Sequence, residues 1–391
     1  MMATLLALNA LAIDTMLPAL AEIGKFYQVE NPNDQQLVIF SYILGFGIPQ
    51  LFFGPISDRF GRKGLLQFSL IGYSITAFWC MAANSFEMLL AIRFLQGVFS
   101  AGARVIAGAV IRDVTSGRVM AKVMSLVLTV FMIVPILAPG LGTIIMKFAH
   151  WKWTFGILGF AGMATFVWTF LRLPKTLPVE NRRPLDPKSI LSGYWTVMTT
   201  RVTLGYMAAS GIIFGALFAF IGASEQIFAD AFGKGDKFWL WFGIIAVMLA
   251  IANFMNSKIV ERVGMRRISH AVMLAFIGFS ILNLIAMPLT GENFYVFLFI
   301  FALTFACFGM MGANFAALAL EPLGEMSGTA NAAYGFATST VSSLIGLAVA
   351  RQFDGTIMPI LGGFLVLGVA SLFVVLLTEK GKLFELGEGK S

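Results

Sequence analysis

Two short charged stretches decide the fold of this chain: GPISDRFGRK at residues 54–63 and SKIVERVGMRR at residues 257–267. The acid, arginine and glycine of the first stretch, Asp58, Arg59 and Gly61, recur at the same spacing 203 residues later in the second. Each stretch lies between two long apolar segments. This recurrence predicts two related halves with the same topology, the parallel-repeat arrangement of many polytopic membrane proteins.

The composition excludes a soluble globular protein. Of the 391 residues, 58% are hydrophobic and 12% are charged, and the mean hydropathy is +0.86, whereas a soluble domain carries about 25% charged residues. A membrane-crossing helix needs about 20 apolar residues, so the apolar content suffices for about twelve such helices. We therefore predict an all-α integral membrane protein with twelve transmembrane helices in two six-helix halves.

Apolar stretches between clusters of charged and turn-forming residues mark the predicted spans. In the N-terminal half they cover residues 2–21, 36–56, 65–83, 86–110, 121–146 and 152–171. In the C-terminal half they cover residues 203–228, 238–256, 269–289, 294–320, 328–350 and 356–377. The predicted organisation is an N-terminal half at 1–172, a cytoplasmic linker at 173–202 and a C-terminal half at 203–391. The linker is rich in proline and basic residues, and it has room for a short surface helix near residues 190–200.

The distribution of basic residues predicts the orientation. If both termini are cytoplasmic, 19 of the 27 lysines and arginines lie in cytoplasmic loops or tails and 6 lie on the opposite face. This bias follows the positive-inside rule. The first span has no basic segment before it, so we interpret it as a retained span and not as a cleaved signal. We expect a multi-pass protein of the cytoplasmic (inner) membrane with both termini cytoplasmic.

Four motifs resemble those of the major facilitator superfamily. The 54–63 stretch resembles its signature loop, and RFLQG at residues 93–97 resembles its R-x-x-Q-G motif. The segment APGLG at residues 138–142 is similar to the G-P-x-x-G-G antiporter motif, although Ala138 and Thr143 depart from it. DTMLP at residues 14–18 resembles the D-x-x-x-P element of drug:proton antiporters. Together with WKW at 151–153 and GTA at 328–330, the motifs are most similar to the bicyclomycin and chloramphenicol resistance branch.

Asp14 is the first candidate functional residue, because it is the only acid well inside any of the first six predicted spans. A carboxylate inside a membrane is costly and is usually functional and paired. If burial or a neighbouring arginine changes between two conformations, such a group takes up and releases a proton. The resemblance implies proton coupling by Asp14 together with Arg93. The alternative is a carboxylate that only caps the span near Pro18.

Two arginines lie within the fourth predicted span. Arg93 and Arg104 are eleven residues apart, which places them on nearly the same helix face at about 100° per residue. Gly97 and Ser100 share that face. The pattern predicts a polar wall of an aqueous cavity. Alternatively, Arg104 reaches interfacial water along its own side chain.

The signature loop is expected to form a conformational lock made of Gly54, Asp58, Arg59, Gly61 and Arg62. The resemblance implies that the acid is associated with the start of the eleventh span, near Gly328. The alternative is that the basic residues serve only as topology signals. In the fifth span, the antiporter motif residues Pro135, Pro139 and Gly142 predict a kinked, thin helix that a neighbour can approach closely.

Polar residues at positions compatible with a substrate cavity complete the set: Tyr42, Gln50, Arg104, Glu225, Asn253, Asn314, Asn331 and Tyr334. Each of them has the alternative of a helix-to-helix contact. Glu225 departs from the resistance branch, which more often has proline after this serine, so it is either a loop acid in water or a second titratable site.

The sequence excludes several other classes. It has no Walker A loop and no Ser/His/Asp set, and its two histidines and two cysteines suggest neither a metal site nor a disulfide. We therefore expect no enzyme activity, no cofactor, no metal and no nucleic-acid partner. The expected function is a proton-coupled multidrug or antibiotic efflux antiporter that works by alternating access as a monomer. Its partners would be small lipophilic or amphipathic substrates, protons and membrane lipid. The alternative is an exporter or exchanger of an anionic organic metabolite that uses the intramembrane arginines.

Overall fold

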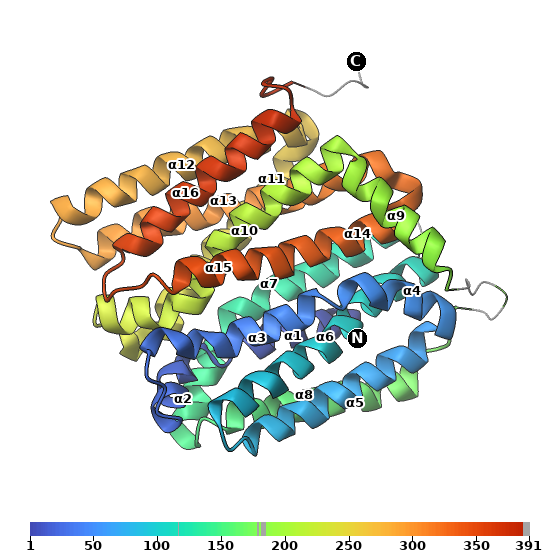
Figure 1. Cartoon of the computed structure of the whole chain (residues 1–391), viewed down its shortest axis with the longest axis horizontal. Coiled ribbons are helices and arrows are strands. Elements are labelled where there is room, and N and C mark those ends of the chain that lie inside the picture. Colours follow the sequence, from blue (N-terminus) through green and yellow to red (C-terminus); the bar gives the residue numbers. More distant parts are fainter. Residues whose placement is uncertain (116, 178–179, 181–184, 386–391) are drawn as a thin grey trace. The chain divides into compact units, whose positions relative to one another are not determined.

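The computed structural model describes residues 1–115, 117–177, 180 and 185–385, and over these ranges every regular element is a helix (Figure 1). This confirms the predicted all-α class. The chain forms two compact units, an N-terminal unit at Met1–Gly193 and a C-terminal unit at Tyr194–Ser391. The division falls within helix α9 (Pro187–Thr199), inside the segment that was predicted to be a linker.

The helices of the N-terminal unit follow the six predicted spans in order. They are α1 (Met2–Asp14), η1 (Leu17–Ala19), α2 (Leu20–Phe26), η2 (Pro32–Gln36), α3 (Leu37–Gly47), α4 (Gln50–Phe60), α5 (Arg62–Met81), α6 (Phe86–Val114), α7 (Gly117–Phe148) and α8 (Trp153–Arg172). The first two predicted spans are each broken. Pro18 has no backbone N–H to donate to the carbonyl of Asp14, so it interrupts the first span. Pro49, two residues after the end of α3, lacks this donor too and interrupts the second span.

The C-terminal unit repeats this order after α9. Its elements are α10 (Arg201–Gln226), η4 (Ile227–Ala231), η5 (Gly235–Lys237), α11 (Phe238–Val263), α12 (Met265–Leu289), α13 (Phe294–Leu320), η6 (Glu321–Met326), α14 (Ser327–Phe336), η7 (Ala337–Val341), α15 (Ser342–Ala350) and α16 (Met358–Thr378). The segments η4 and η7 are π-helical. The predicted eleventh span is therefore α14, η7 and α15 in succession.

Ten helices of the described residues are long and apolar enough to cross a membrane, and eleven if the bent pair Pro32–Gly47 and Gln50–Phe60 is one span. The pair is bent by 42°. The fifth predicted span falls in α7, whose described apolar part, Met132–Phe148, is shorter. A chain with this many apolar helices is a multi-pass membrane protein.

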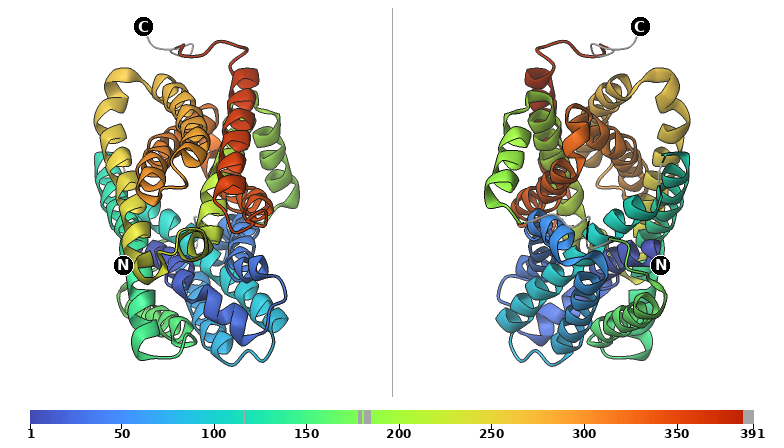
Figure 2. Two further views of the ribbon diagram at one scale, coloured as in Figure 1. Left: turned by 90° about the vertical axis from the view of Figure 1, so that its left-hand side faces the viewer. Right: turned by 90° about the vertical axis from the view of Figure 1, so that its right-hand side faces the viewer.

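The helices of each unit lie side by side (Figure 2). Small residues let neighbouring helices approach closely. A Cβ built on Gly97 of α6 would lie 2.1 Å from the carbonyl oxygen of Tyr42 in α3. In the C-terminal unit, a Cβ on Gly205 of α10 would lie 1.9 Å from Oγ1 of Thr378 in α16. Such close contacts of small residues are how helices associate in lipid, where no hydrophobic force drives them together.

Candidate functional site

Asp14 is the last residue of α1 and lies at a break in the first span. The break spans Thr15 and Met16, and the short helix η1 begins at Leu17. Asp14 is buried, with 4% of its surface exposed. Among the described residues, no side chain forms an ion pair or a hydrogen bond with its carboxylate. The hydroxyl of Thr15 is likewise buried and unsatisfied within the described part of the chain.

Helix α7 packs directly on this break through the antiporter segment. A Cβ built on Gly142 would lie 2.0 Å from the carbonyl oxygen of Thr15 and 2.9 Å from Cγ of Pro18. Real Cβ atoms do not approach other atoms that closely, so only glycine permits this contact. Pro139 is buried one turn earlier, and its carbonyl accepts a hydrogen bond of 2.9 Å from Thr143. Gly142, one of the residues predicted to thin the fifth span, therefore lies against the residues that follow Asp14.

Arg93 fastens α6 to the last turn of α1. Its side chain is fully buried. Its Nη2 donates a hydrogen bond of 2.9 Å to the carbonyl of Ala12, two residues before Asp14, and its Nε donates one of 3.2 Å to the carbonyl of Val38. Its Nη1 donates one of 2.6 Å to Oε1 of Gln96. No carboxylate among the described residues pairs with this guanidinium.

Tyr42 completes the junction of α1, α3 and α6. Its hydroxyl forms hydrogen bonds with Oδ1 of Asn9 at 2.9 Å and with Oγ of Ser100 at 2.7 Å. The guanidinium of Arg93 lies 4.4 Å from the centre of the Tyr42 ring, which is cation–π geometry. The structure thus brings three of the predicted residues, Asp14, Arg93 and Tyr42, to one junction. Asn9 was not predicted, because one asparagine in an apolar span gives no distinctive pattern.

The two arginines of the predicted polar wall of α6 lie in different environments. Arg93 does not line an open cavity, because its side chain is fully buried against the backbone of α1 and α3 and the ring of Tyr42. Arg104 is exposed, and its guanidinium lies 5.4 Å from the ring centre of Phe46. Gln50 is buried and donates a hydrogen bond of 3.2 Å to the carbonyl of Phe46.

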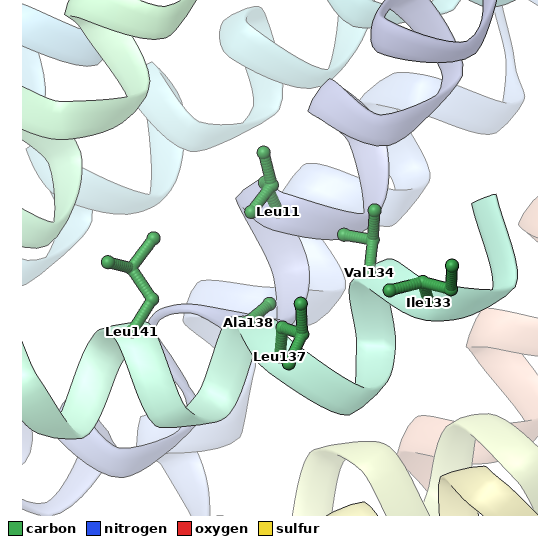
Figure 3. Close-up of a pocket in the computed structure, with 6 residues that line it drawn as sticks. All are labelled: Leu11, Ile133, Val134, Leu137, Ala138 and Leu141. Carbon is green, nitrogen blue, oxygen red and sulfur yellow. The ribbon is translucent and has the colours of Figure 1, made fainter. Parts of the chain in front are cut away.

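An apolar cavity of about 200 Å³ lies between α1 and α7 (Figure 3). It is lined by Leu11, Ile133, Val134, Leu137, Ala138 and Leu141. Leu11 is one helical turn before Asp14, so the cavity adjoins the turn of α1 that carries the buried carboxyl group. The pocket is open, since Ile133 and Leu137 are 47% and 64% exposed.

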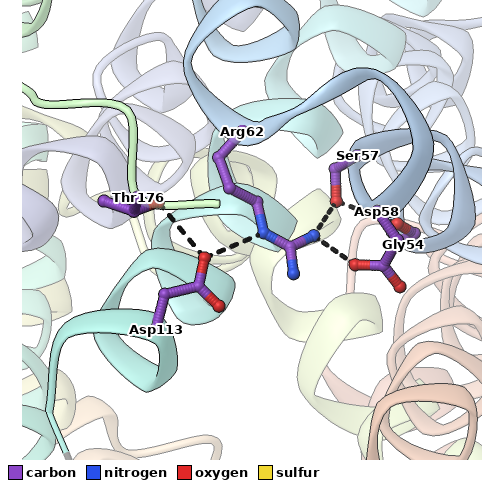
Figure 4. A network of polar contacts seen from close by, with 6 residues as sticks. All are labelled: Gly54, Ser57, Asp58, Arg62, Asp113 and Thr176. Atoms are coloured by element: carbon purple, nitrogen blue, oxygen red, sulfur yellow. Dashed lines mark hydrogen bonds and ion pairs between the residues drawn. The ribbon is translucent and has the colours of Figure 1, made fainter. Parts of the chain in front are cut away.

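The signature loop forms a charged network within the N-terminal unit (Figure 4). Arg62 forms an ion pair with Asp58 and a hydrogen bond with Ser57. Its Nε also donates a hydrogen bond of 3.1 Å to Oδ2 of Asp113 at the end of α6, and Thr176 donates to the same oxygen at 3.2 Å. The network joins the start of α5 to the end of α6. The association of Asp58 with the start of the eleventh span stays a prediction.

The other predicted members of the lock have different roles. Gly61 joins α4 to α5 at φ 93° and ψ 150°, a conformation that is essentially restricted to glycine. The carbonyl of Gly54 accepts a hydrogen bond of 2.8 Å from Ser57. Arg59 is exposed. The backbone turn therefore depends on Gly61, while the charges around Arg62 hold the helices on either side of it.

The second charged stretch has the same backbone turn. Gly264 joins α11 to α12 at φ 93° and ψ 143°. Arg266 at the start of α12 lies 3.5 Å from Glu321, which follows α13, and donates a hydrogen bond of 3.0 Å to Glu379 at the end of α16. Arg266 thus joins the ends of three helices. The two units therefore share an arrangement. An arginine shortly after the turn glycine pairs with an acid near the end of the fourth predicted span in the first unit and of the tenth in the second.

Three acids in these networks, Asp113, Glu321 and Glu379, were not predicted as site residues. Asp113 lies three residues after the fourth predicted span and Glu321 directly after the tenth, so their similar positions at the ends of corresponding spans are a signal that could have identified them. Glu379 also accepts a hydrogen bond of 2.6 Å from the hydroxyl of Tyr206. That hydroxyl lies 3.1 Å from Nε2 of His270.

The predicted cavity residues of the C-terminal unit are dispersed. Asn314 and Asn256 exchange two side-chain hydrogen bonds, of 3.1 and 2.9 Å, and both residues are buried. Tyr334 and Ser210 are joined by a hydroxyl–hydroxyl hydrogen bond of 3.0 Å. The pairing of Asn314 is the helix-contact arrangement that was its alternative.

Four further candidates are placed by their helices. Glu225 is partly buried on α10, just before the π-helical segment η4, and Asn253 is partly buried on α11. Asn331 is exposed on α14, and Pro135 is partly buried within α7. The described residues contain no cluster of three His, Cys, Asp or Glu side chains that could hold a metal ion.

Comparisons with known proteins agree with this architecture. The family model of the Major Facilitator Superfamily matches residues 2–347. The chain is 33% identical to the "Bicyclomycin resistance protein homolog" of Haemophilus influenzae over 89% of this chain and 87% of the relative. It is 27% identical to the "Multidrug resistance protein MdtL" of Salmonella typhi over 80% of this chain and 78% of the relative.

Among solved structures, the chain resembles the xylose transporter XylE from E. coli in a partially occluded inward-open conformation, with a TM-score of 0.73 and 15% sequence identity. The match covers 97% of both chains. It also resembles the human organic anion transporter MFSD10, with a TM-score of 0.66, 17% identity and coverage of 96% of this chain and 97% of that chain. At these identities the likeness concerns the fold. The family model and the bacterial relatives show that this chain belongs to the Major Facilitator Superfamily and is a membrane transporter.

Proposed function

We propose that this transporter is a proton-coupled antiporter that exports small lipophilic or amphipathic compounds, antibiotics among them, by alternating access. Its relatives are named for bicyclomycin and multidrug resistance, which supports a substrate class of this kind. The cycle draws its energy from the proton gradient and requires neither a cofactor nor a metal. The protein acts as a monomer in the inner membrane, with both termini cytoplasmic.

The observation that carries the proposal is the buried carboxyl group of Asp14. It lies inside a membrane span, and no cation among the described residues compensates it. A carboxyl group in such a place is a strong candidate for a proton-binding site, because its protonation follows any change in its surroundings. Arg93 holds the preceding turn through Ala12, so a movement of α6 relative to α1 changes those surroundings.

The apolar pocket beside this carboxyl group supports a lipophilic substrate. Six apolar residues line it, and five of them belong to α7. Gly142 of the same helix contacts the break after Asp14. A lipophilic group bound in the cavity would therefore press on the helix that contacts the proton site. This gives a physical route by which substrate binding and proton binding exclude one another.

Transport by purified protein in proteoliposomes tests the proposal. Wild-type protein should accumulate a lipophilic substrate when a pH gradient is imposed, whereas Asp14→Asn should lose that accumulation and retain substrate exchange without a gradient. The retained exchange would show that the variant is folded and binds substrate. Unchanged gradient-driven accumulation by Asp14→Asn would contradict the proposal.

The alternative of an anionic organic substrate now depends on Arg104. Arg93 is enclosed by protein and contacts backbone carbonyls, whereas Arg104 is exposed within its span. A substrate carboxylate or phosphate can therefore approach Arg104 more easily. In that case Arg104→Ala should selectively remove the binding of anions. A variant that keeps the same order of preference among neutral, cationic and anionic compounds would exclude this alternative.

A further inference from the structure

Helix α9 has an exposed apolar face. Leu191, Trp195 and Met198 are four and three residues apart, so they lie on one side of the helix. Their exposed fractions are 72%, 70% and 50%. An isolated exposed side chain needs no explanation, but three large apolar residues aligned along one helix mark an interaction surface.

The helix itself is well defined at both ends. The side chain of Asp186 accepts hydrogen bonds from the backbone of Lys188 at 3.2 Å and of Ser189 at 3.1 Å, which caps its first turn. At the other end, Thr200 adopts an extended conformation at φ −80° and ψ 106°. Helix α10 begins at the next residue, Arg201. The end of α9 is therefore one residue from the start of a membrane span.

The short connection between α9 and α10 determines what surrounds the exposed face. Because α10 crosses the membrane, the end of α9 must lie at the membrane surface, where lipid is the adjacent apolar phase. An interfacial helix typically presents leucine and tryptophan to lipid and lysine at the border with water. Lys188 is exposed on α9 beside the apolar face, and its long side chain can reach a lipid phosphate.

The opposite face of α9 is covered by the C-terminal unit. Val197 is fully buried in a cluster with Met207 of α10 and with Ala330 and Ala333 of α14. Figure 1 shows α9 beside α14. Because α9 packs on the first turns of α14, a contact that holds the outer face of α9 in place also holds the start of the eleventh span in place.

We propose that α9 is an interfacial helix whose apolar face, Leu191, Trp195 and Met198, inserts into the lipid leaflet and anchors the start of the eleventh span to the membrane surface. This inference goes beyond the proposed transport function and does not depend on it. The partner of this face is the lipid bilayer, because the single residue Thr200 joins α9 to the membrane span α10.

Fluorescent labels on single introduced cysteines test the proposal in the full-length protein in liposomes. The native Cys80 and Cys307 are buried, and unsubstituted protein serves as the labelling blank. Leu191→Cys reports on the apolar face. Ser189→Cys is the matched control, because Ser189 is exposed and lies about 160° around the helix from Leu191.

Two quenchers distinguish the surroundings of the labels. The label at Leu191 should be quenched several-fold more by lipids that carry a nitroxide than by aqueous iodide, and the label at Ser189 should show the reverse. Equal access of iodide to both labels would mean that the face is bare, and it would overturn the proposal. Protection of the Leu191 label from both quenchers would mean that protein covers the face, either a second copy or another segment, and would overturn it as well.

Discussion

Gly142 of α7 lies so close to the backbone of Thr15 that a methyl group on Gly142 would be 2.0 Å from the Thr15 carbonyl oxygen. Thr15 directly follows Asp14, the buried acid of the first span. The antiporter motif therefore contacts the chain at the proposed proton site. This contact lies entirely within the N-terminal unit, and it is the basis of the first prediction.

Gly142→Ala should lower gradient-driven transport at least ten-fold, because the added methyl group forces α7 away from the break in the first span. Gly140→Ala is the matched control, since no atom lies within 4 Å of a Cβ built there. Both changes replace glycine by alanine in the same helix, where alanine is favoured by about 1 kcal/mol. Initial transport rates at equal protein density measure the effect. Equal rates for the two variants would show that the contact has no role in coupling.

Arg93→Met should destabilise the N-terminal unit and abolish transport. The guanidinium makes three hydrogen bonds inside the protein, to Ala12, Val38 and Gln96. A hydrogen bond to a charged group contributes about 1.5–3 kcal/mol, and the released carbonyls would stay buried. Arg93→Lys should restore only part of the stability, since an ammonium group cannot reproduce the planar fork.

The unfolding temperature of the purified protein checks this prediction. Arg104→Lys is the control, because Arg104 lies in the same helix but is exposed. A drop in unfolding temperature that is no larger for Arg93→Met than for Arg104→Lys would mean that Arg93 does not hold α1 and α3 together.

Asp58→Asn should slow turnover more than it weakens substrate binding. Removing its charge breaks one of the two ion pairs of Arg62 and leaves the pair with Asp113. We expect a several-fold lower transport rate with a substrate dissociation constant within about two-fold of wild type. Arg59→Gln changes an exposed charge of the same loop and should leave both quantities unaltered. If Asp58→Asn also leaves them unaltered, the loop serves only to set topology.

Gly61→Ala and Gly264→Ala should each destabilise the protein. Both glycines have φ 93° with ψ near 150°, and a residue with a side chain in this conformation costs about 1–3 kcal/mol. Gly64→Ala, three residues after Gly61 and with nothing within 4 Å of the added Cβ, should be neutral or stabilising. The unfolding temperatures of the three variants decide the matter. A neutral Gly264→Ala would show that the second charged stretch tolerates a different turn.

Much of the fold could be predicted because lipid imposes a simple pattern on the sequence. Spans need long apolar segments, and the two glycine turns are marked by the repeated acid-Arg-x-Gly pattern. The interruption of the first span at Thr15 was not predicted, although Pro18 provides its cause. Hydropathy reports on the polarity of a segment but is insensitive to a short local break inside it.

The candidate site was only partly predictable, because its partners come from different helices. Arg62 and Asp113 are 51 residues apart, and Asn256 and Asn314 are 58 apart. Such pairs depend on which helices pack together and at what height, and a local pattern does not specify either. Asp14 could be identified because a lone acid in an apolar span is costly whatever its neighbours are.

The central claim is that Asp14 is the group that exchanges protons with substrate. Proton release from the purified protein, measured with a pH dye in weakly buffered detergent solution when a lipophilic substrate is added, tests it most directly. The account predicts release by the wild-type protein and no release by Asp14→Asn, with substrate binding retained in the variant. Proton release by Asp14→Asn equal to that of the wild type would contradict the account.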